Sequence, residues 1–396
     1  SVDRLFRNTM PYNFEEYSEC GHVEGTIAHV VDLRSDTITK PTVEMRKAMA
    51  VAEVGDDVFG EDPTVNELER RSAELMGKED GIFLSSGTMC NIIAVMVHCN
   101  KRSVEFIAGD KSHLHLFEQG GPAVLAGVQS SIVTNNPDGT FSLEEMESKI
   151  RTSNDSHETS TALIVVENTH NLCGGRVLPL EWLDKLAKIA ANYNLPLHMD
   201  GARIMNAVVK SKVSAKRIAR DMDSVCFCLS KGLSCPVGSV LCGSKSFIKQ
   251  ARRYRKLLGG GMRQVGILAA AGLVALDEMI DRLQIDHDHA YKIAKAISDA
   301  DSDIVRVDLS AVQTNIVNIH LDTGKITSKA FLEQLAKITE TEEVSVKALS
   351  FSPSSIRLVL HWEIKHHDVA AVIRKLKFVI KGLHCRRYIT YLDVKN

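Results

Sequence analysis

Apolar and polar residues alternate in a regular pattern through the middle of the chain. Between residues 81 and 242, short runs rich in β-branched and aromatic residues predict buried strands, and longer amphipathic segments between them predict helices. The predicted strands are 81–85, 104–107, 129–133, 162–167, 196–200, 224–229 and 238–242, and the predicted helices are 88–99, 142–151, 180–194 and 214–221. This alternation is typical of an α/β fold with a mostly parallel, seven-stranded sheet covered on both faces.

The segments on either side of this region predict further helices and a second, smaller domain. Helices are expected from Pro41 to Met49, over 65–76, over 244–257 and over 263–283. A second alternating region has strands expected at 303–309, 315–321, 344–350 and 355–361, and helices at 327–339 and 366–381. We therefore expect an N-terminal arm over 1–29, a large domain over 30–280 and a small C-terminal α+β domain over 281–396, with residues 30–50 able to pack on the small domain.

Composition narrows the function classes. The 396 residues are 44% hydrophobic and 25% charged, with a formal net charge of −2, which is ordinary for a globular protein. This balance gives no support for a nucleic-acid or membrane partner, and no apolar run has the length of a membrane span. The nine cysteines are scattered, which favours a reducing compartment such as the cytoplasm. Cys226 and Cys228 are not followed by a second pair at zinc spacing, so no metal site is expected.

Three polar positions follow predicted strands. Lys231 stands where the run 225–229 stops, either as a surface lysine or as an amine in a partly desolvated pocket that can form a Schiff base. Asp200 ends the strand 196–200, where it could cap a helix or hold a pyridinium nitrogen protonated. Gly87 and Thr88 open a helix, whose first amides suit a phosphate. In this order the three positions match the layout of pyridoxal phosphate (PLP) enzymes of fold type I.

Longer motifs make the resemblance specific. The chain resembles the low-specificity L-threonine aldolases of the β-eliminating lyase family from about residue 30 to residue 365. The similar stretches are 32–37 (DLRSDT), 55–64 (GDDVFGEDPT), 86–88 (SGT), 167–171 (ENTHN), 198–203 (HMDGAR), 230–233 (SKGL) and 258–264 (LGGGMRQ). The resemblance implies an aspartate-aminotransferase-like fold, PLP as cofactor, and cleavage of L-threonine or L-allo-threonine to glycine and acetaldehyde, a route of glycine biosynthesis.

The same resemblance implies which residues bind the cofactor. Lys231 would hold PLP covalently, Asp200 would pair with its ring nitrogen, and Arg203 would lie near its phenolic oxygen. His113 would stack on the ring, while Gly87 and Thr88 would hold the phosphate. Arg263, together with Lys256, would reach that phosphate from a neighbouring subunit. The enzyme would then be a homo-oligomer, with a dimer of dimers expected, whose active sites are shared between subunits.

Arg357 is the candidate for the substrate carboxylate. It lies in an otherwise apolar strand, where a guanidinium needs an anionic partner, either a structural carboxylate or the carboxylate of a substrate. By resemblance, Ser35 would help to hold the same carboxylate, and His157 would lie near the substrate hydroxyl. The base that takes the hydroxyl proton stays open between His157, His113 and a water held by a histidine.

Two other classes of function remain open on the sequence. Racemisation, transamination or β-elimination of another small amino acid could use the same scaffold and cofactor. Phe59 also stands where many family members carry tyrosine, which leaves the substrate preference open. A non-catalytic protein could have kept the fold, but Lys231, Asp200, Arg203 and Arg357 are costly polar groups without a ligand, and they argue against it.

Overall fold

The structure is a computed structural model that describes residues 29–152, 155–339 and 342–393. The chain divides into two compact units. The larger unit is Thr39–Gln284, and the smaller one combines the residues up to Ile38 with those from Ile285 onward. The first described residues therefore belong with the C-terminal part of the chain.

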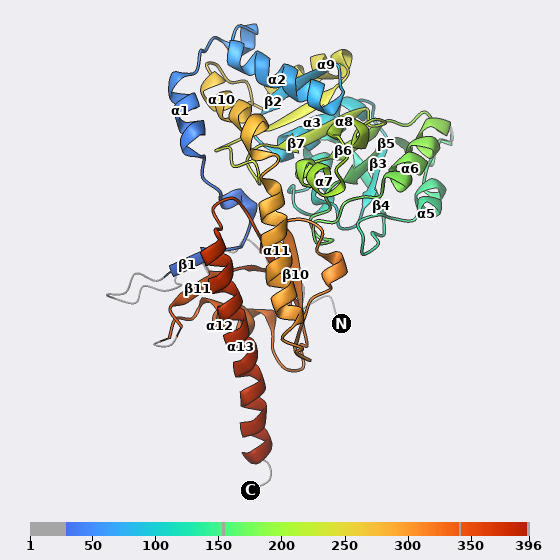
Figure 1. The fold of residues 1–396 in the computed structure, drawn as a ribbon. Coiled ribbons are helices and arrows are strands. Elements are labelled where there is room, and N and C mark those ends of the chain that lie inside the picture. The colour runs from blue at the N-terminus through green and yellow to red at the C-terminus, as the bar shows by residue number, and fades with distance from the viewer. Residues whose placement is uncertain (1–28, 153–154, 340–341, 394–396) are drawn as a thin grey trace. The chain divides into compact units, whose positions relative to one another are not determined.

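The larger unit is built on a seven-stranded sheet (Figure 1). Its strand order is β2-β8-β7-β6-β5-β3-β4, and all neighbours are parallel except β8, which runs antiparallel to both β2 and β7. The strands are β2 (Asp80–Leu84), β3 (Val104–Gly109), β4 (Gln129–Val133), β5 (Ser160–Glu167), β6 (Leu197–Asp200), β7 (Ser224–Cys228) and β8 (Ser239–Gly243). The fold class and all seven predicted strands are confirmed.

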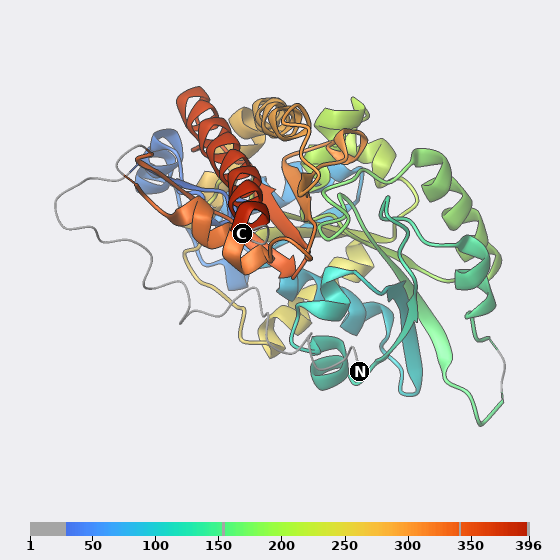
Figure 2. The ribbon, with the colours of Figure 1, turned by 90° about the horizontal axis from the view of Figure 1, so that it is seen from below.

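Helices cover both faces of this sheet, as Figure 1 and Figure 2 show from two directions. On one face, α3 (Gly87–His98) and α9 (Lys245–Leu257) pack together over Ile82 and Leu84 of β2. On the other, α2 (Pro63–Met76) approaches so closely that a Cβ on Gly81 would lie 2.9 Å from a carbonyl oxygen of α2. Because strands buried on both faces need apolar residues at successive positions, these strands appear in the sequence as continuous apolar runs.

The remaining helices of the larger unit connect strands or precede the sheet. They are α1 (Val43–Val51), α4 (His113–Leu116), α5 (Leu143–Ser148), α6 (Leu180–Asn192), α7 (Ile204–Ser211), α8 (Ala215–Ile218) and α10 (Gly266–Val274). The single helix expected over 263–283 is instead α10 followed by a π-helical turn at Ala275–Met279. The helix begins at Gly266 because the buried Asp62 carboxylate accepts the Gly266 N–H at 2.8 Å.

The smaller unit contains two short sheets over one apolar core. A four-stranded antiparallel sheet has the order β12-β13-β10-β9, and β1 pairs with β11 in parallel. The strands are β1 (His29–Asp32), β9 (Val305–Arg306), β10 (Ile316–Leu321), β11 (Val344–Lys347), β12 (Leu349–Ser352) and β13 (Ser355–Val359), and the helices are α11 (Leu283–Ser298), α12 (Ser328–Ala336) and α13 (His366–Asp393). None of the described helices combines the length and apolarity needed to cross a membrane.

Candidate active site

The carboxyl ends of parallel strands bring Asp200, His113 and Lys231, three of the predicted site residues, to one edge of the sheet. Asp200 is the last residue of β6, and in the sheet register it lies between Glu167 at the end of β5 and Cys226 of β7. His113 begins α4 after β3, and Lys231 follows β7 by three residues. Residues far apart in sequence thus meet because their strands are parallel neighbours.

Asp200 is a buried carboxylate, with 4% of its surface exposed. Its oxygens accept hydrogen bonds from Asn91 Nδ2 at 2.9 Å and from the Ala202 N–H at 3.0 Å. Burial by itself would raise the pKa of Asp200, but the charges of His113 and Lys231 together with these hydrogen bonds outweigh it, and the pKa is lowered. Asp200 is therefore ionised at neutral pH, as a partner for a protonated ring nitrogen must be.

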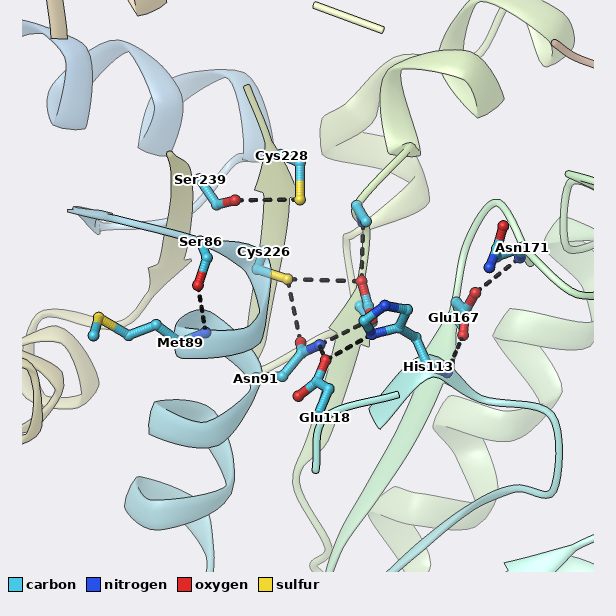
Figure 3. A network of polar contacts seen from close by, with 12 residues as sticks. Ser86, Met89, Asn91, His113, Glu118, Glu167, Asn171, Cys226, Cys228 and Ser239 are labelled. Atoms are coloured by element: carbon cyan, nitrogen blue, oxygen red, sulfur yellow. Dashed lines mark hydrogen bonds and ion pairs between the residues drawn. The ribbon is translucent and has the colours of Figure 1, made fainter. Parts of the chain in front are cut away.

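His113 is held by two carboxylates. Its backbone N–H donates to Glu167 Oε2 at 2.7 Å, and its ring Nδ1 lies 2.9 Å from Glu118 Oε1 (Figure 3). Burial would lower the pKa of His113, but the bond to Glu118 and the charge of Asp200 outweigh it, so the pKa is raised. Side-chain atoms of His113, Glu118 and Asp200 all lie within 4.8 Å of one another. The site thus has a histidine with a raised pKa beside two acids.

Glu167 organises the loop that follows β5. One carboxylate oxygen accepts the N–H of His113, and the other accepts the N–H of Asn171 at 2.8 Å. Asn171 in turn accepts a long bond, 3.5 Å, from the Arg203 guanidinium. Glu167 therefore fixes the backbone of His113, a predicted cofactor ligand, and that of Asn171, whose side chain contacts Arg203; its place in the motif 167–171 did not reveal this role.

The N-terminus of α3 faces the same edge of the sheet. Ser86 caps the helix by accepting the Met89 N–H at 3.1 Å, and Gly87 is the first helical residue. A Cβ at Gly87 would lie 2.8 Å from the Cys228 sulfur, so only glycine fits between the helix and β7. Thr88 is exposed beside it. A twelve-residue helix with an exposed hydroxyl in its first turn suits an anionic phosphate.

Arg203 and Lys231 complete this edge. Arg203 is buried, with 6% of its surface exposed, and lies three residues beyond Asp200 at the start of α7. Lys231 is half-buried, and its carbonyl accepts hydrogen bonds from Thr39 Oγ1 at 3.2 Å and from the Ser234 N–H at 2.8 Å. These bonds hold the backbone of the lysine while its ammonium acts electrostatically on Asp200.

Three predicted residues of the larger unit lie apart from this cluster. His157 precedes β5 and therefore stands at the amino end of a strand whose carboxyl end carries Glu167; its side chain is 90% exposed and pairs with Asp155. Lys256 is exposed near the end of α9. Arg263 has a side chain that is 55% exposed and pairs with Asp56 at 2.8 Å. The structure therefore does not bring these three residues together with Asp200, His113 and Lys231.

The predicted carboxylate-binding residues lie together in the smaller unit. Arg357 is 4% exposed, donates to the carbonyl of Arg34 at 3.1 Å, and places its guanidinium 4.6 Å from the ring centre of Phe351. Ser35 follows Arg34 directly. The Val359 N–H donates to the Leu33 carbonyl, so β13 runs alongside the segment that contains Ser35. The two residues are therefore neighbours although more than 300 positions separate them.

The sequence matches the model of the beta-eliminating lyases over residues 32–346. The chain belongs to the β-eliminating lyase family. This lyase is 47% identical, over 89% of the chain and 97% of the relative, to a protein of Arabidopsis thaliana named probable low-specificity L-threonine aldolase 2. It is 43% identical to the low specificity L-threonine aldolase of Escherichia coli (strain K12), over 87% and 97% of the two chains.

A solved structure of Leishmania major threonine aldolase has the same fold as this lyase. The TM-score is 0.74 at 18% sequence identity, and the match covers 88% of this chain and 99% of that one. The lyase therefore has PLP fold type I, and pyridoxal phosphate is its cofactor. The residues fit this cofactor: a buried ionised Asp200 suits a pyridinium, Arg203 suits an oxyanion, and the N-terminus of α3 suits a phosphate.

Proposed function

We propose that this lyase is an aldolase that cleaves L-threonine and L-allo-threonine into glycine and acetaldehyde. The observation that carries the proposal is the cluster of His113, Asp200 and Lys231 at one sheet edge, in a chain 47% identical to a relative named as a threonine aldolase. The cluster supplies an ionised acid, a histidine with a raised pKa and an amine within electrostatic range of one another. These are the groups that a reaction at the amino-acid Cα–Cβ bond requires.

The cofactor ligands are assigned by position. Lys231 would attach PLP covalently, Asp200 would keep a proton on the ring nitrogen, and Arg203 would compensate charge on the phenolic oxygen. Gly87 and Thr88 would hold the phosphate at the start of α3. Bound PLP supplies an electron sink for the pair released when the Cα–Cβ bond breaks. Because that sink depends on a protonated ring, the ionised state of Asp200 is central to the proposal.

His113 is the proposed base for the β-hydroxyl proton, acting directly or through a water. Its ring lies at the site edge, whereas His157 lies at the opposite end of β5 and would take part only from another subunit. Glu118 accepts from Nδ1, so Nε2 is the nitrogen available to the substrate. After the aldehyde leaves, His113 would pass the proton taken from the hydroxyl to the released Lys231 amine, which would return it to Cα and then hold the cofactor again.

Arg357 and Ser35 are the proposed partners of the substrate carboxylate. A guanidinium can bind a carboxylate through two parallel hydrogen bonds, which fixes the rotation of the amino acid about its Cα–N bond. That rotation decides which bond to Cα stands perpendicular to the cofactor ring and therefore breaks. Stacking on Phe351 and the bond to the Arg34 carbonyl hold the arginine in place before substrate arrives.

We also propose that the protein is a homo-oligomer, a dimer of dimers, with shared sites. Large apolar side chains are exposed at Val51, Val58, Phe59 and Leu257, with exposed fractions of 83%, 40%, 73% and 70%. Val58 lies 4.0 Å from the position a Cβ on Gly261 would take, next to Lys256. An apolar surface beside Lys256 and Arg263 supports burial against a second subunit whose phosphate these cations would reach.

The buried, free cysteines support a cytoplasmic location, where a glycine-producing aldolase would serve glycine biosynthesis.

The direct test of the reaction is product analysis. The purified protein, loaded with PLP, is mixed with L-threonine or with L-allo-threonine, and glycine and acetaldehyde are quantified. The proposal predicts equimolar glycine and acetaldehyde from both substrates. A keto acid would indicate transamination, ammonia would indicate elimination, and an inverted substrate would indicate racemisation. Any of these as the main product would replace the aldolase assignment, and no product at all would favour a non-catalytic scaffold.

A further inference from the structure

One neutral amide lies between two buried acids. Asn91, in the middle of α3 and 1% exposed, donates from Nδ2 to Glu118 Oε1 at 2.8 Å and to Asp200 Oδ2 at 2.9 Å (Figure 3). Both carboxylates are buried, and they offer oxygens within 4.8 Å of each other. Two carboxylates this close in a low-dielectric interior would ordinarily share a proton. The two hydrogens of one amide group give each acid its own donor. Burial and the charge of Asp200 still raise the pKa of Glu118, whereas the pKa of Asp200 is lowered, so Asp200 is the acid that keeps its charge.

The orientation of the Asn91 amide is set by the residues on the side opposite the two acids. Only the NH₂ group can face two acceptors, so Asn91 Oδ1 must face the other way. There it lies 3.0 Å from His198 Nε2 and 3.4 Å from the Cys226 sulfur, both of which can donate to it. His198 is fully buried, so its Nε2 carries the hydrogen that locks the amide.

The hydrogen-bonded series continues from His198 to Ser224 and His98, away from the site. His198 Nδ1 lies 2.9 Å from Ser224 Oγ, and Ser224 Oγ lies 2.8 Å from His98 Nε2. Burial lowers the pKa of His198 to about 3 and that of His98 to about 4, so both rings are neutral and each has one N–H. With the hydrogen of His198 on Nε2, His198 donates to Asn91 and accepts at Nδ1, so Ser224 donates to His198 and His98 donates to Ser224. Every bond then points toward the two acids.

The fold places this series of residues without strain. Asn91 and His98 are seven residues apart on α3, two helical turns, and so lie on one face. His198 and Asp200 alternate along β6, as Ser224 and Cys226 do along β7, and the register pairs His198 with Ser224 and Asp200 with Cys226. One helix face therefore meets one face of two adjacent strands, and the polar residues form a single line through an otherwise apolar layer.

We propose that Asn91 is a positioning residue, which keeps Asp200 ionised and aimed beside a second buried carboxylate, with His98, Ser224 and His198 fixing its amide. The proposal rests on the assignment of Asp200 as the partner of the cofactor ring nitrogen. Asn91 itself makes no contact with the cofactor in this scheme. Its effect passes through Asp200 and, by way of Glu118, through His113.

The test measures ligand binding rather than turnover. Pyridoxamine 5′-phosphate carries the same ring and phosphate but no aldehyde, so it binds without condensing with Lys231. Its Kd is measured by equilibrium dialysis against the cofactor-free protein from pH 5 to pH 8. The substitution is Asn91→Leu, which keeps the side-chain size and removes both donors. Because the two acids would then share a proton, Kd at pH 7 should rise roughly 10- to 100-fold, as expected for lost bonds to a charged group. The weakening at acid pH should also begin at a higher pH than in wild type.

A double substitution separates this role from general damage. Adding Glu118→Gln to Asn91→Leu removes the second carboxylate, so Asp200 no longer shares a proton. The double variant should bind more tightly than Asn91→Leu alone and lose its acid shift. Damage that merely loosens the fold would instead make the double variant weaker still. Such a result, or a Kd profile in Asn91→Leu identical to wild type, overturns the proposal.

Two further variants cover folding and the assumption about Asp200. Ser224→Ala should raise Kd roughly 2- to 10-fold, the effect of one neutral hydrogen bond, whereas Ser72→Ala, an equally buried serine on α2, should leave Kd unchanged. If Ser224→Ala and Ser72→Ala changed Kd equally, then His198, Ser224 and His98 would have no part in fixing Asn91. This conclusion would hold even if Asn91→Leu failed to fold. Asp200→Asn should raise Kd at pH 7 at least as much as Asn91→Leu does, because the ring nitrogen then loses its anionic partner. If it leaves Kd unchanged, the cofactor assignment of Asp200 fails; if it raises Kd while Asn91→Leu behaves as wild type, only the role of Asn91 fails.

Discussion

The charges of two buried acids of the central sheet, Glu105 and Asp200, are compensated by different kinds of partner. Glu105, near the amino end of β3, is fully buried and receives Arg151 Nη1 at 2.7 and 2.6 Å and Thr161 Oγ1 at 3.1 Å. Asp200, at the carboxyl end of β6, receives hydrogen bonds from an amide side chain and a backbone N–H. The first charge is neutralised by a bonded cation of the same chain. The second is kept ionised by neutral donors and by charges at a distance, so a cationic ligand can still pair with it.

This contrast indicates that the amino edge, with Glu105, serves stability and the carboxyl edge, with Asp200, serves function. At the amino edge, the ion pair between Glu105 and Arg151 connects β3 to the segment before β5. At the carboxyl edge Glu118 Oε2 is buried with no hydrogen-bond partner in the described part of the chain, and Asp200 keeps its charge. Unsatisfied buried groups are retained where a ligand or a reaction uses them. Substitutions at the two edges should therefore affect different measurements.

The largest expected effect at the carboxyl edge is that of Lys231→Ala. Without the amine, PLP cannot be held covalently and no group returns the proton to Cα, so turnover should be abolished. The half-buried position of Lys231 makes the shorter side chain tolerable, and the unfolding temperature should stay near that of wild type. Glycine formation and thermal denaturation are the two measurements. Wild-type turnover in this variant would remove Lys231 from the mechanism.

Asp200→Asn and Glu105→Gln test the contrast between the edges directly. Asp200→Asn removes the charge that keeps the ring nitrogen protonated and should lower kcat by orders of magnitude while the protein stays folded. Glu105→Gln breaks a buried ion pair and should cost roughly 1–3 kcal/mol of unfolding free energy while kcat is unchanged. The measurements are kcat and chemical denaturation for both variants. If Asp200→Asn lowered the unfolding free energy but left kcat unchanged, Asp200 would serve stability rather than catalysis.

A subunit-mixing experiment tests whether Arg263 contributes to the active site at the carboxyl edge of a neighbouring subunit. Lys231→Ala and Arg263→Ala subunits should each be inactive alone. If Arg263 acts in the neighbouring subunit, a hybrid dimer has one site with both lesions and one intact site. Random mixing should then restore up to roughly a quarter of wild-type activity. Lys295→Ala, which removes an exposed lysine paired with Asp299, replaces Arg263→Ala in the control mixture. No recovery despite confirmed hybrids would place Arg263 in its own subunit's site or outside any site.

Arg357→Lys tests the smaller unit. Lysine keeps the charge but loses the planar pair of donors, so the substrate carboxylate would be held by one contact and could rotate. The loss should amount to roughly 1.5–3 kcal/mol, seen as a KM raised about 10- to 100-fold. The ratio of glycine to keto acid should also fall, because the bond that stands perpendicular to the ring is less well fixed. If both KM and the product ratio match wild type, Arg357 is a structural residue.

The smallest expected effect is a pH shift in Glu118→Gln. The bond to Glu118 and the charge of Asp200 raise the pKa of His113 against the opposing effect of burial. As a base His113 must be neutral, so kcat/KM rises with pH through this pKa. Glutamine removes the anionic acceptor, lowers the pKa and should move the acid limb to lower pH. Lys149→Ala, which removes the ion-pair partner of the half-buried Glu145 on α5, serves as the control. A limb that moves upward or stays in place would exclude His113 as the base.

Much of the fold and part of the site could be predicted from the sequence. The strands of the larger unit are continuous apolar runs, and Lys231 and Asp200 could be located because each interrupts such a run at its carboxyl end. Parallel packing then places both residues at one edge. Helix α7 (Ile204–Ser211), which directly follows the motif 198–203, was not among the predicted helices.

The supporting residues could not be predicted, because their partners depend on register and helix rotation. Asn91 stands alone among apolar residues of α3, a detectable signal, but nothing local indicates that two acids lie above it and a histidine below. Glu118 lies in an irregular segment after α4. His157 was assigned by resemblance only, and its position before β5 depends on where the strand begins. The pairing of β1 with β11 joins segments more than 300 residues apart, which no local pattern encodes.

We propose that the carboxyl edge of the sheet holds PLP through Lys231, and covalent labelling tests this attachment most directly. The holoprotein is reduced with borohydride, digested with a protease, and mapped by mass spectrometry for the phosphopyridoxyl group. The account predicts one labelled peptide, with the group on Lys231, and no label on Lys256, which is exposed and close to the proposed interface. A stoichiometric label on any lysine other than Lys231 would contradict the account.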